Sequence, residues 1–223
     1  MWGGEIDQRK QGGLWALNLV GAEHRWEQIT TKGQEPPRRT EHRMVSHGGR
    51  LIVFGGESGV NSYFSDLHVL VLSASSSSGG GGGKKGKKGK KGRKQQQQQQ
   101  QQPASASSIM TGRWKRIVAV DSAQRPFTVL RRTSSAACVT GDRLFIHGGN
   151  TDCDTGCATL EVVDLADFTW SRPTLRGEPP LATSEHSMIE TPSGGGVLVF
   201  GGYIPQARRH LNSRTPRQFN NLR

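Results

Sequence analysis

The sequence predicts an all-β fold assembled from repeated antiparallel units, and two observations support this prediction. A short apolar segment closed by two glycines occurs as RLIVFGG, RLFIHGG and GVLVFGG, and the chain opens on MWGGE. A tryptophan follows each of the first three Gly-Gly pairs. We expect structural roles for the repeated residues, which are Gly3, Gly4, Trp26, Gly55, Gly56, Trp114, Gly148, Gly149, Trp170, Gly201 and Gly202.

The spacing of the repeat locates an insertion. Successive second glycines are 52, 93 and 53 residues apart, at Gly4, Gly56, Gly149 and Gly202. The surplus falls within residues 73–108, which hold no apolar side chain larger than alanine until Ile109. Such a segment cannot bury enough surface to offset the entropy of ordering it, so we expect disorder. The predicted organisation is repeats over 1–72, a Ser/Gly/Lys/Gln-rich insertion over 73–112 and further repeats over 113–223.

Each unit contains four predicted strands. Residues 38–56 place two apolar segments on either side of a short glycine turn, which predicts a hairpin. A third strand is predicted over 66–72, where apolar residues alternate, with counterparts at 14–19 and 159–165. A fourth short strand begins at each tryptophan. Four antiparallel strands in a unit of about fifty residues are the pattern of a β-propeller blade.

These residues resemble the kelch family of β-propellers, in which an apolar strand closed by Gly-Gly is followed by a tryptophan. The resemblance covers nearly all of the chain outside 73–108. The segments HRMVSHGGRLIVFGGE and PPRRTEH are similar to intracellular kelch-domain-containing proteins. The tyrosine that many kelch blades carry before the tryptophan is absent, and Leu17, Val69 and Val162 stand near its place. The resemblance implies a kelch-type propeller that contacts other proteins.

The number of repeats predicts an incomplete ring. Propellers close with four to eight blades, whereas three periods separate Gly4 from Gly202. The sequence stops at FNNLR, which is similar to the start of the strand over 66–72. We therefore expect a propeller of about three to four blades that is part of a longer protein or is closed by self-association. Trp26 and Trp170 are then expected to lack part of their packing.

Charge and cysteine content limit the function classes. The formal net charge of +12 includes eight cations between Lys84 and Lys94, so the predicted repeats are only mildly basic. Three cysteines are an odd and small number for a secreted chain. The sequence carries no apolar stretch typical of a signal peptide or a membrane span. We expect an intracellular protein, either cytoplasmic or nuclear.

Catalytic and metal-binding signatures are scarce. GGGGGKK differs from a phosphate-binding loop, because Ser78 replaces the first glycine and Lys85 replaces the hydroxyl residue. Cys153 and Cys157 lie in one acidic loop, but a zinc site needs four ligands, commonly from CxxC pairs. We therefore predict no enzyme activity, no metal and no cofactor.

Strand alternation places the loop after each Gly-Gly pair and the loop entering the next hairpin on one face, with the insertion on the other. Loops held by a rigid scaffold are common sites of partner recognition, although solvated polar loop residues are the simpler interpretation. The candidate partner-binding residues on this face are Arg38, Arg39, Glu57, Asn61, Tyr63, Arg131, Arg132, Asn150, Asp152 and Asp154.

Three functional hypotheses follow. The first is a non-enzymatic scaffold for protein–protein interaction. The second is a nucleic-acid-associated protein in which the basic segment 84–94 binds polyanions weakly. The third is a kelch-like oxidase, for which Tyr63 and Tyr203 are the available tyrosines. Deletion of 73–112 is expected to leave the repeat fold unchanged.

Overall fold

The computed structural model describes residues 2–19, 23–59, 62–75, 109–151 and 156–204, which are all-β. No helix that could span a membrane occurs among them. The strands in chain order are β1 (Glu5–Ile6), β2 (Arg9–Lys10), β3 (Leu14–Asn18), β4 (Arg25–Gly33), β5 (Arg43–His47), β6 (Arg50–Phe54), β7 (Leu67–Ser75), β8 (Ile109–Ile117), β9 (Ala136–Thr140), β10 (Arg143–His147), β11 (Leu160–Asp164), β12 (Trp170–Ser171), β13 (Ser187–Glu190) and β14 (Val197–Phe200).

Strands β9 to β12 form a complete four-stranded sheet in the order β12-β11-β10-β9. Leu144 pairs with Val139 on one side and with Val163 on the other, and Val163 pairs with Trp170. Consecutive strands are neighbours and alternate in direction, which is the order of a propeller blade. The predicted four-strand unit is confirmed.

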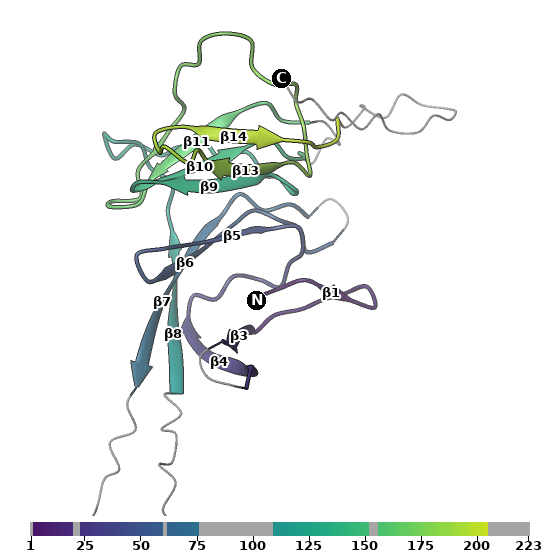
Figure 1. Cartoon of the computed structure of the whole chain (residues 1–223), viewed down its shortest axis with the longest axis vertical. Coiled ribbons are helices and arrows are strands. Elements are labelled where there is room, and N and C mark those ends of the chain that lie inside the picture. Colours follow the sequence, from purple (N-terminus) through teal and green to yellow (C-terminus); the bar gives the residue numbers. More distant parts are fainter. Residues whose placement is uncertain (1, 20–22, 60–61, 76–108, 152–155, 205–223) are drawn as a thin grey trace, which may run out of the picture.

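The preceding sheet repeats this order and carries two further strands (Figure 1). Its order is β3-β4-β8-β7-β6-β5, so β5 to β8 form a second blade with β4 beside its outer strand. This attachment is parallel and joins Thr30–Gly33 to Thr111–Trp114. Leu17 pairs with Trp26 as Leu70 pairs with Trp114. Strands β3 and β4 are therefore the outer half of another blade.

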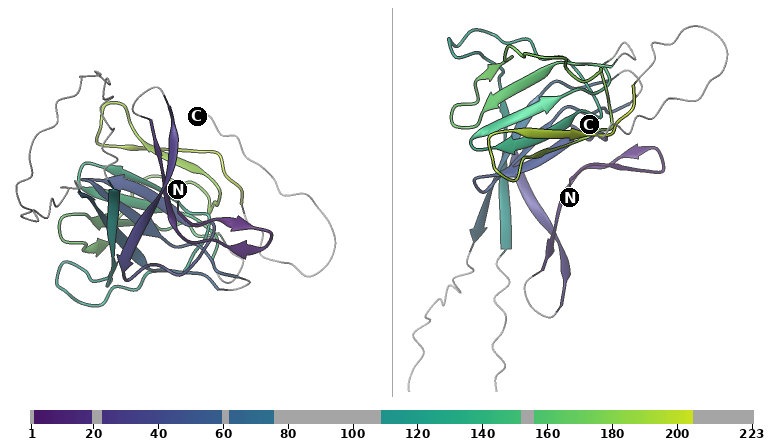
Figure 2. Two further views of the ribbon diagram at one scale, coloured as in Figure 1. Left: turned by 90° about the horizontal axis from the view of Figure 1, so that it is seen from below. Right: turned by 45° about the horizontal axis from the view of Figure 1, so that its top comes forward.

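The β13–β14 hairpin lies against β9 (Figures 1 and 2). Met188 of β13 packs against Ala136 and Cys138 of β9. The inner hairpins β5–β6, β9–β10 and β13–β14 thus follow one another from blade to blade. The described residues form an incomplete β-propeller, as the sequence predicts.

Apolar clusters fill the space between neighbouring blades. One joins Ile52 to Leu144 and Trp170, a second joins Leu70 to Trp2, and a third contains Met188 of β13 and its contacts on β9. Full burial of one such side chain contributes about 2 kcal/mol to folding. The blades are therefore held together chiefly by side chains from the repeated strands.

The three repeated tryptophans differ in burial. Trp114 and Trp170 are each 2% exposed, whereas Trp26 is 53% exposed. The expectation that Trp170 lacks part of its packing is wrong, because Phe54 and Phe127 lie at ring-centroid distances of 5.9 and 6.0 Å from it. The same expectation is confirmed for Trp26.

The geometry of Gly55 and Gly56 explains why glycine stands at these positions. Both have positive φ, 63° and 90°, which side chains rarely adopt. A Cβ on Gly55 would lie 2.7 Å from the carbonyl oxygen of Arg132 in the next blade. The N–H of Gly56 donates to that same oxygen at 2.9 Å. A Gly-Gly pair therefore turns the chain and brings two blades into backbone contact.

Strands β7 and β8 extend further than predicted. Their pairing runs from Leu67 opposite Ile117 to Ser75 opposite Ile109. Both ends of the predicted insertion, 73–75 and 109–112, are thus ladder residues in a hairpin that projects from the sheet (Figure 1). The rest of the predicted insertion, 76–108, lies outside the described residues.

Candidate interaction face

Loops of each repeat pair with one another at one edge of the sheets. Thr40 and Glu57 exchange two backbone hydrogen bonds, each 3.0 Å long. Each bond links the residue entering an inner hairpin to the residue after a Gly-Gly pair. The exchange recurs between Thr133 and Asn150 and between Ser184 and Tyr203. These two sets of loops form one surface, which we call the loop face.

A row of backbone hydrogen bonds crosses the loop face from blade to blade. The N–H of Ser134 donates to the carbonyl oxygen of Glu41 at 3.0 Å, and the N–H of Glu185 donates to that of Ser134 at 2.9 Å. All three residues have positive φ, between 50° and 58°. Strain of this kind persists where surrounding contacts fix the backbone. The row holds the exposed side chains of Glu41 and Glu185 on either side of Ser134.

Arg39 is fully buried beneath the loop face. Its guanidinium donates to both carboxylate oxygens of Asp66, at 2.6 and 2.9 Å, and to the carbonyl oxygen of Gly55 at 2.8 Å. Burial alone would raise the pKa of Asp66, but hydrogen bonds from Arg39 and His68 hold it well below its usual range. The group is thus an internal ion pair that fixes a Gly-Gly turn.

Arg132 is the equivalent residue in the next blade and is also fully buried. It lies 2.5 Å from one carboxylate oxygen of Glu161, and Arg172 lies 2.6 Å from the other. Removing one partner of such a buried pair leaves an uncompensated charge. Neither Arg39 nor Arg132 presents its guanidinium to solvent, so both shape the loop face from within.

The other candidate residues occupy different positions on the loop face. Arg38 and Arg131 are exposed, whereas Glu57, Tyr63 and Asn150 are half-buried. Glu57 also receives an ion pair from Lys10 at 3.1 Å. The remaining candidates, Asn61, Asp152 and Asp154, lie outside the described residues.

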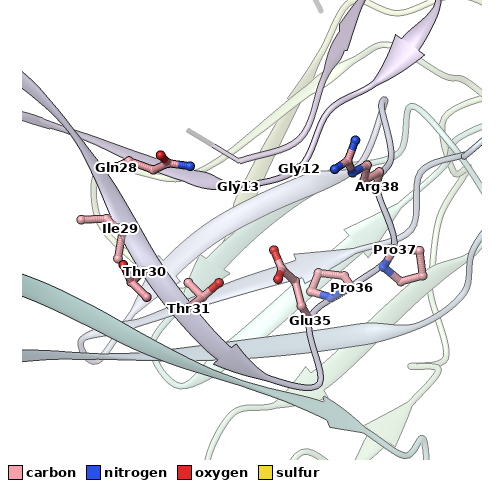
Figure 3. Close-up of a pocket in the computed structure, with 10 residues that line it drawn as sticks. All are labelled: Gly12, Gly13, Gln28, Ile29, Thr30, Thr31, Glu35, Pro36, Pro37 and Arg38. Carbon is pink, nitrogen blue, oxygen red and sulfur yellow. The ribbon is translucent and has the colours of Figure 1, made fainter.

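The structure adds a groove to the loop face that the sequence did not indicate (Figure 3). It has a volume of about 660 Å³ and lies between Gly12 and Gly13 just before β3, residues 28–31 of β4 and the segment 35–38. Glu35 and Arg38 stand on one side and Gln28 on the other (Figure 3).

Two histidines meet where β9–β12 contacts β13–β14. His147 Nδ1 lies 3.0 Å from His186 Nε2, and both rings are buried. Burial, followed by the charges of His147 and Arg43, lowers the pKa of His186 to about 4. Burial and Arg132 lower the pKa of His147. Both rings are therefore neutral at physiological pH.

The cysteine loop is described only in part. Cys157 is a buried free thiol, as is Cys138 on β9, and Cys153 lies outside the described residues. Within the described ranges, no three histidine, cysteine or acidic side chains are grouped to hold a metal ion.

Comparison with known proteins supports the blade assignment. Kelch domain-containing protein 3 of Bos taurus is 25% identical over 174 residues, covering 75% of this chain and 35% of that protein. Host cell factor of Drosophila melanogaster is 37% identical over 76 residues, covering 34% of this chain and 5% of that protein. These two similarities support the resemblance to kelch-repeat proteins that the sequence predicts. No family model matches the chain.

The chain spans only part of the length of the relatives that it matches. Acyl-CoA-binding domain-containing protein 4 of Arabidopsis thaliana is 26% identical over 178 residues, which are 79% of this chain and 20% of that protein. The chain thus spans about a fifth of that relative, and the acyl-CoA-binding domain in its name is a property of that protein.

Proposed function

We propose that this chain is a non-enzymatic scaffold that binds partner proteins through the loop face. The observation that carries the proposal is the repeated exchange of hydrogen bonds between Thr40 and Glu57, which holds the loops at fixed positions. Successive repeats keep this backbone frame while they change its side chains, since Glu57 is replaced by Asn150 and then by Tyr203. A rigid frame with variable side chains is suited to recognising a specific protein surface.

The arrangement of titratable groups supports a non-enzymatic role. The pKa of Asp66 is strongly lowered beneath the loop face, but its carboxylate is bound by Arg39 and His68. A catalytic acid or base needs a reacting atom within hydrogen-bond reach. These groups instead have internal hydrogen bonds that fix the turn at Gly55.

The proposal is tested by comparing the wild-type chain with two variants in affinity capture from cell extract. We expect Ser58→Arg combined with Arg131→Glu to lose partners that the wild type retains, because both residues are exposed on the loop face. Deletion of 76–108 should retain those partners. Equal capture by the loop-face variant and the wild type would contradict the proposal.

One observation favours nucleic-acid association as a second candidate. Lys32 and Arg113 are opposite one another across β4 and β8, and both are exposed with Lys115 two residues further along β8. Arg113 and Lys115 lie on β8, the strand that follows segment 76–108, and Lys32 lies beside them on β4. The basic residues of that segment would add to the same charge. Binding of a 20-nucleotide RNA that falls steeply with salt and disappears on deletion of 76–108 would support it. RNA binding that is unchanged by the deletion would contradict it.

Self-association remains a prediction. The apolar side chains of Leu198 and Phe200 on β14 are each 51% exposed, which supports contact with further strands. Light scattering of the purified chain at increasing concentration tests it, and a constant monomer mass would oppose it.

A further inference from the structure

The groove of Figure 3 has an equivalent in the next blade, and the two can be aligned residue by residue. Strand pairing equates Leu14 with Leu67 and Ile29 with Ile117, because the two pairs hold the same register. The second groove is smaller, about 390 Å³, and is lined by Ser65, Asp66, Arg116, Ile117, Val118, Ala119, Phe127, Val129 and Gln34. Gly12 and Gly13 of the first groove thus stand where the second has Ser65 and Asp66.

In the second blade, the chain itself provides a segment that pairs with the strand beside the groove. The N–H of Phe127 donates to the carbonyl oxygen of Ala119 at 3.0 Å, and Val120 is bridged to Pro126. The ring of Phe127 also stacks on Trp170. A piece of extended chain beyond the end of β8 therefore satisfies backbone groups that would otherwise face solvent.

Among the described residues, no such segment pairs with β4 in the blade that contains β3 and β4. The connection from Ile29 to Arg39 comprises residues 30–38, whereas the equivalent connection from Ile117 to Arg132 comprises 118–131 and is longer. Pro36 and Pro37 occupy the shorter connection and have no N–H to donate. The connection 118–131 is thus long enough to supply a pairing segment beside β8, and the connection 30–38 is too short to supply one beside β4.

The edge of β4 beside the groove is free among the described residues. Pairing between β3 and β4 ends at Ile29, and Thr30–Gly33 pair only on their other edge, with β8. A strand edge presents N–H and C=O groups that can bind another chain. The missing side chains at Gly12 and Gly13 leave room next to this edge, and the φ of +90° at Gly13 favours glycine.

The charged groups at the groove are available for a ligand. Glu35 and Arg38 are exposed, and neither forms an ion pair with another described residue. The stem of Arg38 lies against Gly12, where a Cβ would be 3.2 Å from Arg38 Cγ. The wall also includes the polar residues Gln28, Thr30 and Thr31, together with the apolar residues Ile29, Pro36 and Pro37.

We propose that this groove binds an extended peptide segment of a partner protein, which adds to the free edge of β4. An acidic side chain of that peptide meets Arg38 and a basic side chain meets Glu35. Backbone hydrogen bonds provide affinity and the two charges provide orientation. The proposal rests on the proposed function, because it names the kind of partner segment that the loop face takes up.

The test uses the full chain and fluorescein-labelled hexapeptides of threonine and valine with one aspartate and one lysine at varied positions. Fluorescence anisotropy should select one order and spacing of the two charges. Exchanging the protein charges with Glu35→Arg and Arg38→Glu should reverse the preferred order. In an added strand, only alternate N–H groups of the peptide point toward β4. N-methylation of either the odd-numbered or the even-numbered peptide nitrogens should therefore weaken binding at least tenfold, and methylation of the other set should have a smaller effect. The matched control exchanges two charges outside the groove and the loop face. Asp142→Arg with Arg143→Glu changes exposed residues at the β9–β10 turn and should bind the peptides as the wild type does.

Binding that is absent for every peptide, or unaffected by exchange of Glu35 and Arg38, would overturn the peptide site. The scaffold function would still stand if the Ser58 and Arg131 variant lost its partners in affinity capture. If that variant kept its partners, the scaffold proposal itself would fail, whatever the peptides did.

Discussion

Two kinds of blade surface occur in this molecule, and equivalent residues differ between them. Phe54 ends β6 and is 1% exposed, whereas Phe200 ends β14 at the same place in its repeat and is 51% exposed. Trp170 and Trp26 differ in the same way. Phe54 and Trp170 lie on a blade surface that is covered by a neighbouring blade, which we call the closed surface. Phe200 and Trp26 lie on surfaces that no neighbouring blade covers among the described residues, which we call open. The repeated sequence thus specifies a strand, and the neighbouring blade determines what that strand contributes to stability.

The largest expected effect comes from truncating one tryptophan of each kind. Trp170→Ala should lower the free energy of unfolding by about 4 kcal/mol, because it opens a cavity beside Phe54 and Phe127. Trp26→Ala should lower it by about 0.5 kcal/mol. Urea denaturation followed by circular dichroism measures both. Phe54→Leu and Phe200→Leu form a second matched pair, and equal losses within either pair would contradict the comparison.

The fold was largely predictable from the sequence, because the signals that define it are local. Alternating apolar residues located β7, and a glycine turn located the β5–β6 hairpin, both within a few residues of their observed bounds. The burial of Trp170 was not predictable in the same way. It depends on Phe127, which lies in a connection whose path the repeat does not specify.

The candidate site was less predictable than the fold. Arg38 and Arg39 are adjacent in sequence, yet one is exposed at the groove and the other is fully buried against Asp66. Sequence alone does not distinguish a surface guanidinium from one in an internal ion pair, because the carboxylate partner is distant in the chain. The groove was missed for a related reason, since it depends on the absence of side chains at Gly12 and Gly13.

The next effect concerns the buried ion pair within the closed part of the molecule. Arg132→Met should destabilise the chain by about 3 kcal/mol, because Glu161 is fully buried and retains only Arg172. The double variant Arg132→Met/Glu161→Leu should recover most of this loss. Thermal and urea unfolding of the single and double variants measure the coupling. A double variant as unstable as Arg132→Met would oppose the ion-pair explanation.

A smaller effect is expected from pH at the boundary between β9–β12 and β13–β14. The pKa of His186 is about 4 in the folded chain, against an ordinary value of 6.5, so the unfolded chain binds more protons between these values. The contribution of His186 to stability should therefore be fully present above about pH 6.5 and should fall toward pH 4, by about 2 kcal/mol between pH 7 and pH 5. His186→Phe should flatten this part of the profile.

His42 provides a comparison within the same measurement. Its pKa is also lowered to about 4, first by burial and then by Arg39, at the contact with Trp2. His42→Phe should remove a similar share of the pH dependence. A profile that is unchanged in both variants would show that other groups account for the acid sensitivity.

The smallest effect is expected from removing the segment between the two long strands, and it sharpens the distinction between inserted chain and blade. Ser75 and Ile109 are opposite one another at the end of the β7–β8 ladder, so an Asn-Gly turn can replace residues 76–108 without moving either strand. We expect the thermal midpoint of this variant to stay within about 1 °C of the wild type, since surface changes that spare core contacts are nearly neutral.

Deleting 73–112 instead removes Thr111 and Gly112, which pair with Thr30 and Thr31 and hold β4 to the sheet. Thermal unfolding of the two deletions therefore separates inserted chain from blade, and equal midpoints would mean that the parallel pairing of β4 with β8 contributes nothing to stability.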